Sequence, residues 1–375
     1  KTEGIGPNYE ILVERKNHSD ILTIKVEVEA EQMMDSYGAL EQLEHRLKER
    51  IRLVLGLDAR IQLVSTNTLK RFEGKAKRVT DLRARGAYEA GVKVASAYPG
   101  TPSTEISESL AKYDEVYAEW APNEKVATEV AIGASIAGVR SMCAMKHVGV
   151  NVAADPLYTA AYTGVRGGMV LVAADDPGMY SSQNEQDSRM VARAAMVPVL
   201  EPSDSAEAKE FMKYAYELSE TYDTPMMLRT TTRLSHSQGV VELCPREERE
   251  DIAYERDPAK FVMMPGNAIK RHLVVEARMK KMAEDACHFS INRVEYKDRS
   301  VGFITSGIPY QYVKEAMPNA SVLKLGLVHP LPRKLIEEFA SNVDRLYIVE
   351  ELEPVIEEQV KSWGISKAVG KEIFT

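Results

Sequence analysis

NEKVATEVAIGASIAG, residues 123 to 138, carries the strongest structural signal in this chain. Asn123 is a preferred residue type for a helix N-cap, and Glu124 places a carboxylate in the first turn, where the helix dipole favours negative charge. Small residues follow on the same face, at Ala127, Ala131 and Ser135. The segment therefore predicts a helix whose first turns a flat ring could approach closely.

Two roles fit Glu124. It can simply complement the helix dipole, with Asn123 as the cap. It can also hydrogen-bond to a ring nitrogen of an aminopyrimidine and shift its tautomer, which thiamine diphosphate requires before it becomes a carbanion catalyst. The spacing resembles that around the thiamine-activating glutamate of pyrimidine-binding domains. Glu129 lies about 140° further around the helix and cannot share this role.

Three further motifs accompany this segment. They are YPGTPSTE (98 to 105), MKHVGVNVAADPL (145 to 157) and ADDPGMYSSQNEQDSR (174 to 189). In the first motif, two prolines and a glycine interrupt the chain after a strand, and Ser103 can cap the next helix. Together the four motifs resemble the alpha subunits of indolepyruvate:ferredoxin oxidoreductases, within the 2-oxoacid:acceptor oxidoreductase family, from about residue 84 onward.

The resemblance implies roles for individual residues. Glu124 matches the acid that sets the thiamine tautomer, and Gly100 lies in the turn that contacts the cofactor. Thr101 matches the hydroxyl that faces the 2-oxoacid, with local turn chemistry as the alternative. Lys146 and His147 follow a strand and can pair with the substrate carboxylate, although a buried structural histidine is the alternative for His147. No metal ligand is assigned in this chain.

The family's reaction is the oxidative decarboxylation of a 2-oxoacid to an acyl-CoA. The resemblance implies an arylpyruvate or indolepyruvate substrate, an aryl-acetyl-CoA product, and electron transfer through iron–sulfur clusters to ferredoxin. We expect only the pyrimidine half of the thiamine diphosphate site here, because the Gly-Asp motif and Mg²⁺ that hold the diphosphate are missing. The chain alone is expected to be inactive. We expect it to assemble as a homo- or hetero-oligomer with the missing diphosphate-binding portion and a beta subunit.

Residues 1 to 83 predict a separate, lid-like α+β domain. Alternation predicts strands at 11 to 14, 22 to 28 and 60 to 65, and an apolar stripe from Leu40 to Val54 predicts an amphipathic helix. GIGPNYEILVER and FEGKAKRV resemble the C-terminal subdomain of phenylacetate-CoA ligase, an adenylate-forming enzyme. Lys75 matches the lysine that steadies the carboxylate and α-phosphate during adenylation, and a solvated basic loop is the alternative.

The change of character near residues 81 to 86 is abrupt. The chain is either a fused polypeptide or segments of two neighbouring gene products numbered as one, and we favour the second interpretation. After this join, a strand–helix rhythm predicts α/β architecture. The expected domains are the ligase-like domain 1 to 83, a doubly wound pyrimidine-binding domain 84 to 235, a polar linker 236 to 257 and a transketolase C-terminal-like domain 258 to 375.

The rhythm also places individual elements. The expected strands are 92 to 97, 141 to 145, 169 to 173, 225 to 233, 300 to 305, 321 to 327 and 345 to 349. The expected helices are 103 to 112, 124 to 137, 186 to 195, 206 to 220, 266 to 286, 310 to 316 and 333 to 340. The carboxylates of VEELEPVIEEQV, 349 to 360, are expected to form a solvated face.

Composition excludes several classes of function. The chain has 375 residues, 44% of them hydrophobic and 28% charged, which suffices for two or three cores. Its net charge of −8 argues against nucleic acid as a binding partner. No apolar run is long enough for a membrane span. Three separated cysteines favour a reducing cytoplasm over a disulfide framework or metal site. The rival functions are a phenylacetate-CoA ligase-related chain and a non-catalytic assembly module.

Overall fold

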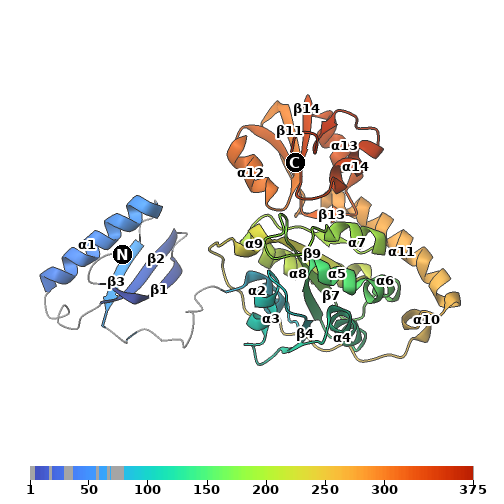
Figure 1. Ribbon diagram of the computed structural model, residues 1–375, viewed down its shortest axis with the longest axis horizontal. Coiled ribbons are helices and arrows are strands. Elements are labelled where there is room, and N and C mark those ends of the chain that lie inside the picture. Colours follow the sequence, from blue (N-terminus) through green and yellow to red (C-terminus); the bar gives the residue numbers. More distant parts are fainter. Residues whose placement is uncertain are drawn as a thin grey trace. The chain divides into compact units, whose positions relative to one another are not determined.

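The computed structural model describes residues 5–16, 19–28, 37–55, 59–65, 68 and 80–374. The chain divides into two compact units, Lys1–Thr80 and Asp81–Thr375, each with its own sheet structure (Figure 1). Among the described residues, every helix is too short or too polar to cross a lipid bilayer. Lys75 and its basic loop lie outside the described residues.

The first unit is a three-stranded sheet with one long helix. Strand β1 (Ile5–Lys16) pairs antiparallel with β2 (Ser19–Val28), and β2 pairs in parallel with β3 (Ala59–Val64). Helix α1 (Tyr37–Leu55) connects the two parallel strands. Leu47 of this helix packs with buried residues of β2 and β3. The predicted α+β domain, with three strands and one amphipathic helix, is confirmed.

The second unit is built on a seven-stranded sheet in the order β13-β8-β9-β7-β6-β4-β5. Its parallel strands are β4 (Val94–Ala97), β5 (Tyr117–Trp120), β6 (Ser141–Lys146), β7 (Met169–Asp175), β8 (Val199–Leu200) and β9 (Met226–Thr231). The short strand β13 (Leu327–His329) pairs antiparallel with β8. Because parallel strands all end at one edge, the segments that follow these strands gather there.

Helices cover both faces of this sheet. One face packs against α2 (Leu82–Glu89), α3 (Thr104–Leu110) and α8 (Ser205–Tyr222). The other face packs against α4 (Glu124–Ile136), α5 (His147–Val152), α6 (Ala154–Thr163) and α7 (Ser188–Ala195). The doubly wound α/β architecture predicted from the sequence is confirmed.

A second sheet follows the long helix α11 (Pro265–Asp285). Its order is β10 (Arg293–Glu295), β12 (Ala320–Leu325), β11 (Asp298–Ser306), β14 (Arg345–Val349) and β15 (Ala368–Val369). The helices of this part are α12 (Pro309–Ala316), α13 (Arg333–Ser341) and α14 (Val355–Ser362). The chain between β12 and α13 contributes β13 to the seven-stranded sheet, so the two sheets share one stretch of chain.

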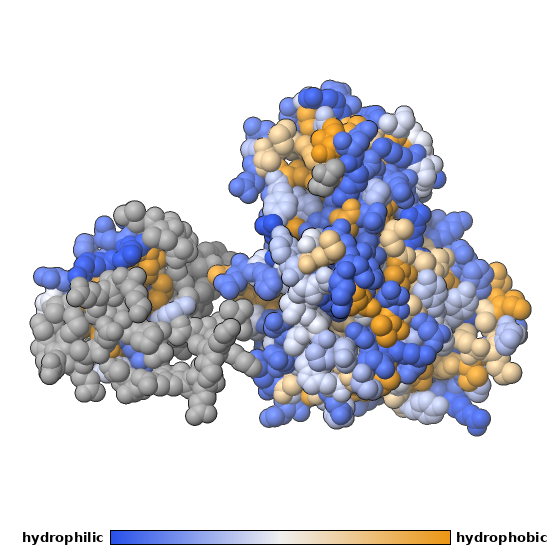
Figure 2. Space-filling view, in the orientation of Figure 1, coloured by the Kyte–Doolittle hydropathy of each residue, from blue (hydrophilic) through white to orange (hydrophobic). Residues whose placement is uncertain are grey.

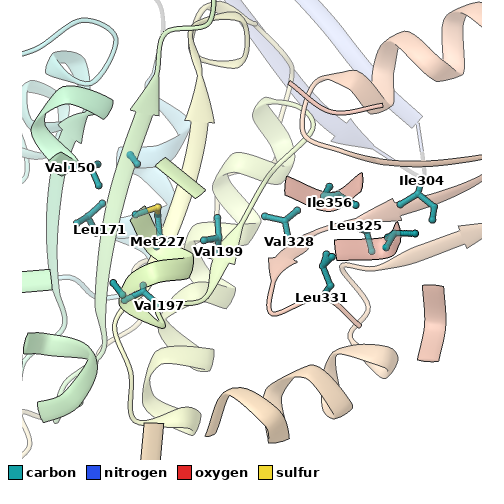
Figure 3. Packing of buried hydrophobic residues seen from close by; sticks show 14 of the residues in the cluster. Val150, Leu171, Val197, Val199, Met227, Ile304, Leu325, Val328, Leu331 and Ile356 are labelled. Atoms are coloured by element: carbon teal, nitrogen blue, oxygen red, sulfur yellow. The ribbon is translucent and has the colours of Figure 1, made fainter. Parts of the chain in front are cut away.

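A continuous hydrophobic core joins the two sheets. Leu171 and Met227 belong to the first sheet, Ile304 and Leu325 belong to the second, and Val328 lies between them (Figure 3). All five side chains are at most 1% exposed. The second unit therefore folds around packing that runs across both sheets.

Charged side chains are buried beside this core, where the carboxyl ends of the two sheets meet. We call them the inter-sheet ion cluster: Asp175, Asp187, Arg189, Glu201, Arg229 and Glu350. The guanidinium of Arg189 donates to Asp187 at 2.6 Å and to Glu350 at 2.7 Å. The guanidinium of Arg229 donates to Asp175 at 2.6 Å and to Glu201 at 2.5 Å. Glu350 follows β14, so these ion pairs tie the second sheet to the first.

Two expectations about this unit are wrong. The strand expected over 225 to 233 ends at Thr231, and Thr232 begins the short helix α9 (Thr232–His236). The carboxylates expected to form a solvated face include Glu350 and Glu357, which are 5% and 6% exposed. Glu350 accepts the backbone N–H groups of α14 as well as Arg189, so it is a buried structural acid.

We predict that Arg189→Met lowers the free energy of unfolding by about 3–5 kcal/mol, because it leaves the carboxylates of Asp187 and Glu350 buried without their partner. Urea unfolding followed by tryptophan fluorescence measures this, since Trp120 and Trp363, the two tryptophans of the chain, both lie in the second unit. Lys125→Met is the control, because Lys125 pairs with Asp155 at the surface and should lose less than about 1 kcal/mol. Equal stability of the two variants would contradict the structural role of the cluster.

Candidate functional site

The predicted site residues lie at the carboxyl edge of three neighbouring strands, β6, β4 and β5. Gly100 and Thr101 follow β4, and Glu124 begins the helix after β5. Lys146 ends β6, and His147 begins α5 directly after it. Close contacts link these segments, because Gly100 packs against Lys146 and Gly149 of α5 packs against Glu124. The structure therefore brings the predicted residues to one edge of the sheet.

Glu124 occupies the first turn of α4 and is half-buried. Asn123 caps this helix, as predicted, by accepting the backbone N–H of Val126 at 3.0 Å. The Glu124 side chain lies so close to Gly149 that a Cβ there would sit 2.6 Å from its Cγ and 2.7 Å from Oε1. Its carboxylate has no hydrogen bond or ion pair with any described residue. An acid is thus held in a glycine-lined position with its acceptor oxygens uncommitted.

The small residues of α4 serve a different purpose from the one expected. Ala127, Ala131 and Ser135 are at most 1% exposed. Ala131 packs in the core against the seven-stranded sheet, and Ser135 donates to the Gly167 carbonyl just before β7. Ser141 of β6 donates to the Ala131 carbonyl at 2.7 Å, which requires close approach of helix and strand. The expectation that a flat ring could use this stripe is therefore wrong, because the protein's own sheet occupies it. Gly133 is exposed and has nothing near it.

The turn after β4 is organised by its neighbours. The Gly100 carbonyl accepts the Ser103 hydroxyl and backbone N–H, both at 2.7 Å, and the Gly100 N–H donates to Thr104 Oγ1 at 2.9 Å. Ser103 therefore closes the turn and does not cap α3 with its side chain, contrary to expectation. Thr101 is exposed, and its hydroxyl has no partner among the described residues. Local turn hydrogen bonds were the alternative role for Thr101. Ser103 and Thr104 make these bonds instead.

Lys146 is only 8% exposed, and its ammonium is already engaged. It donates to the Ser181 carbonyl at 2.6 Å and to the Ser181 hydroxyl at 3.2 Å, and it lies 3.8 Å from the Asp176 carboxylate. A substrate carboxylate would therefore meet an ammonium that also holds the loop after β7. The predicted pairing with substrate requires Lys146 to share its protons with Ser181 or to exchange them.

His147 is buried, with 1% of its surface exposed. Its Nε2 lies 3.1 Å from the Asn184 carbonyl oxygen, which favours the tautomer with the proton on Nε2. Its Nδ1 is also buried and has no hydrogen-bond partner in the described structure. The imidazole ring therefore anchors the loop after β7, in agreement with the alternative that His147 is a buried structural histidine. Its Nδ1 atom remains without a partner among the described residues.

Asp176 was not singled out from the sequence, although its hydrogen bonds order the loop after β7. It is 1% exposed, and its carboxylate accepts Ser181 N at 2.9 Å, Ser182 Oγ at 2.6 Å and Thr232 Oγ1 at 2.7 Å. Burial alone would raise the pKa of Asp176, but these hydrogen bonds and the charge of Lys146 lower it to about 2. Asp176 is therefore a permanent anion, and it fixes the segment that binds the Lys146 ammonium.

The signal for Asp176 was present in the sequence. Asp175 ends the apolar strand β7 and Asp176 directly follows it, and acids at the carboxyl end of a parallel strand lie where ligands bind. The spacing does not reveal that the two acids face different partners. Asp175 joins the inter-sheet ion cluster, whereas Asp176 holds the loop over Lys146.

Comparison with known protein families matches residues 85–301 to the thiamine diphosphate-binding domain of pyruvate flavodoxin/ferredoxin oxidoreductases. Residues 1–83 match the C-terminal domain of AMP-binding enzymes. Indolepyruvate oxidoreductase subunit IorA of Archaeoglobus fulgidus is 48% identical over 302 residues, which cover 77% of this chain and 48% of that protein. The chain thus spans about half the length of the curated relatives it matches.

Two further proteins resemble parts of this chain. Phenylacetate-coenzyme A ligase of Escherichia coli is 35% identical over 83 residues, which cover 22% of this chain and 19% of the ligase. A solved 2-oxoglutarate:ferredoxin oxidoreductase from Magnetococcus marinus aligns with a TM-score of 0.61 and 16% identity, covering 90% of this chain and 68% of that one. At that identity the alignment shows a shared fold. Both resemblances predicted from the sequence are confirmed.

We predict that Asp176→Asn lowers the free energy of unfolding by about 2 kcal/mol at neutral pH, because it removes a charged acceptor of three part-buried hydrogen bonds. The folded-state pKa lies below the ordinary 3.8, so the wild-type advantage is complete above about pH 4 and disappears as the pH falls toward 2. Urea unfolding at several pH values measures both effects.

Asp155→Asn is the matched control for this prediction, because Asp155 pairs with Lys125 at the surface and should change stability by less than about 1 kcal/mol. Tyr180, which is 77% exposed in the same loop, supplies a second measurement by limited chymotrypsin digestion. Faster cleavage at Tyr180 is expected in Asp176→Asn only. A variant that digests and unfolds like wild type would show that Asp176 does not order the loop.

Proposed function

Because this chain belongs to the pyruvate flavodoxin/ferredoxin oxidoreductase family, we propose that it forms the pyrimidine-binding half of the active site in a thiamine-dependent 2-oxoacid oxidoreductase. The observation that carries the proposal is the Glu124 carboxylate, which is held against Gly149 at the carboxyl edge of the sheet without a protein partner. Relatives named indolepyruvate oxidoreductase support an arylpyruvate, such as indolepyruvate, as the substrate.

The residues present fit the pyrimidine end of thiamine diphosphate. The close packing of Gly149 on Glu124 fixes the direction of the carboxylate, since any larger residue at 149 would push the side chain aside. Its uncommitted oxygens can accept or donate a proton at a ring nitrogen, depending on protonation. Once bound, the cofactor supplies the carbanion that reacts with 2-oxoacids. The role of Glu124 is to hold the ring proton that favours the reactive tautomer.

The neighbouring residues position the substrate in this proposal. The Thr101 hydroxyl is exposed and free to hydrogen-bond to the keto or carboxylate oxygen of a 2-oxoacid. Lys146 contributes positive charge beneath the same edge, and the anion of Asp176 keeps its ammonium in place. Gly100 lets the turn approach the Lys146 stem, because a Cβ at residue 100 would lie only 3.3 Å from Lys146 Cβ.

The described residues offer the diphosphate end of the cofactor no cluster of metal-binding side chains. Within the described residues, no group of three or more His, Cys, Asp or Glu side chains could hold a metal ion. We assign Mg²⁺, the diphosphate and the iron–sulfur clusters to other polypeptide segments, which include a beta subunit. Ferredoxin as electron acceptor, coenzyme A as acyl acceptor and a cytoplasmic location belong to the same proposal. The active enzyme is then an oligomer, and this chain alone does not turn over.

A second candidate function concerns residues 1–83 alone. Their match to the C-terminal domain of AMP-binding enzymes favours a ligase lid, in which Lys75 would act on an aryl adenylate. Such a lid works only when it closes on a nucleotide held by a partner domain. We propose that these residues act in arylacetyl-CoA formation only with that domain, and otherwise serve as an interaction module.

We predict that Glu124→Gln keeps the fold but lowers turnover of indolepyruvate at least about 100-fold in the assembled enzyme, because the amide cannot exchange a proton with the ring nitrogen. Ferredoxin reduction measures turnover, and circular dichroism checks the fold. Glu129→Gln is the control, since Glu129 is an exposed acid on the same helix, and it should retain near wild-type activity. An active Glu124→Gln enzyme would remove this acid from the mechanism.

We predict a similar loss of turnover for Gly149→Ala, because the added methyl group would lie 2.6 Å from Glu124 Cγ and displace the carboxylate. Gly133→Ala on the neighbouring helix α4 has open space around the new methyl group and should be neutral or stabilising by up to about 1 kcal/mol. Turnover and thermal unfolding of both variants separate the two effects. Full activity in Gly149→Ala would show that the direction of the Glu124 side chain is not critical.

A further inference from the structure

The second sheet is covered unequally on its two faces. One face packs on α13 and α14 through the core shared with the first sheet. Among the described residues, the other face meets the short helix α12 and the segment around Phe374. Sheets of parallel strands are normally covered by helices on both faces, so a strip of β11 and β14 remains accessible.

This strip forms an apolar groove of about 460 Å³. We call it the β14 groove, and its principal walls are Phe303, Tyr312, Met317, Tyr347, Ile373 and Arg345. Tyr312, Met317 and Ile373 are 44%, 43% and 58% exposed, which is unusual for such large apolar side chains gathered in one place. Hydrophobic residues are visible on this part of the surface, beside α12 and β14 (Figures 1 and 2). The volume lies in the range of small-molecule sites.

The walls of the groove present aromatic rings in ordered contacts. Phe303 and Tyr347 stack with centroids 5.5 Å apart and planes at 27°, and Phe374 meets Tyr347 edge-on at 6.1 Å and 83°. Tyr312 stands on the opposite side, on α12. Aromatic surfaces in these orientations accept a further flat ring by offset stacking or edge contact. A planar aromatic ligand therefore matches the groove better than a flexible chain does.

One charge completes the groove. Arg345 is the single charged residue among those that line it. It lies on the same side of β14 as Tyr347, because alternate residues of a strand share a face. Its guanidinium is exposed and makes no hydrogen bond or ion pair with the described residues. The nearby Asp298 carboxylate accepts from Ser300, and the charge of Arg345 adds to the lowering of its pKa.

We propose that the β14 groove binds a planar aromatic monocarboxylate. The ring of the ligand lies against Phe303, Tyr347 and Tyr312, and its carboxylate accepts two hydrogen bonds from the Arg345 guanidinium in fork geometry. The groove belongs to the second sheet, whereas the Glu124 site lies at an edge of the first. The proposal therefore stands independently of the proposed function.

Calorimetric titration of the 375-residue chain tests this proposal with three probes: 2-naphthoate, its uncharged amide and octanoate. We expect 2-naphthoate to bind with one-to-one stoichiometry and at least tenfold more tightly than either other probe. Arg345→Gln should weaken 2-naphthoate binding at least tenfold while leaving the amide nearly unchanged. Lys334→Gln is the matched control, because Lys334 is exposed on α13, on the covered side of the sheet.

A second variant separates the groove from general effects of charge. Ala316 is exposed on α12 and lines the groove, so Ala316→Trp should fill the space and weaken all probes without unfolding the protein. Glu124→Gln should leave 2-naphthoate binding unchanged. The proposal is overturned if 2-naphthoate does not bind at millimolar concentration, if octanoate binds as tightly, or if Arg345→Gln or Ala316→Trp retains wild-type affinity.

Discussion

The buried guanidinium of Arg189 is the constraint on which the arrangement of the second unit depends. It is fully buried and bridges Asp187, after β7, to Glu350, after β14. A buried charge is tolerated only where its partners are fixed. The two sheets therefore have to pack in the one arrangement that keeps these ion pairs. Arg229 reinforces this by pairing with Asp175 and Glu201 on the first sheet. Ser306 of the second sheet then donates to Glu201 at 2.5 Å.

This ion cluster also divides the carboxyl edge of the seven-stranded sheet between structure and chemistry. The ends of β7, β9 and β8 are occupied by the cluster and by the second sheet. The ends of β6, β4 and β5 carry the candidate site. The boundary falls between two adjacent residues, since Asp175 serves the cluster and Asp176 holds the loop that binds Lys146. The ion-paired half of the edge thereby adjoins the half that is available to ligands.

Much of this fold could be predicted from the sequence, because the helices and buried strands of the second unit have clear periodicity. The errors occur where distant partners decide the outcome. The sequence around Glu350 suggests a solvated acid. Its partner Arg189 lies 161 residues earlier, so the local sequence does not reveal the ion pair. The small residues of α4 suggest space for a ligand, but the protein itself fills that space. Ala131 packs against the sheet, and Ser135 donates to the Gly167 carbonyl before β7. The unpartnered state of Glu124 is likewise visible only in three dimensions.

Glu124 is proposed to hold the pyrimidine of thiamine diphosphate. The most direct test is a crystal structure of the assembled enzyme with the cofactor bound, in which the distance from the Glu124 carboxylate to the nearest pyrimidine ring nitrogen is measured. We predict a charge-assisted or short hydrogen bond of about 2.5–2.9 Å, with the ring placed beside Gly149. A pyrimidine bound elsewhere, or a Glu124 carboxylate more than about 4 Å from every ring nitrogen, would contradict it.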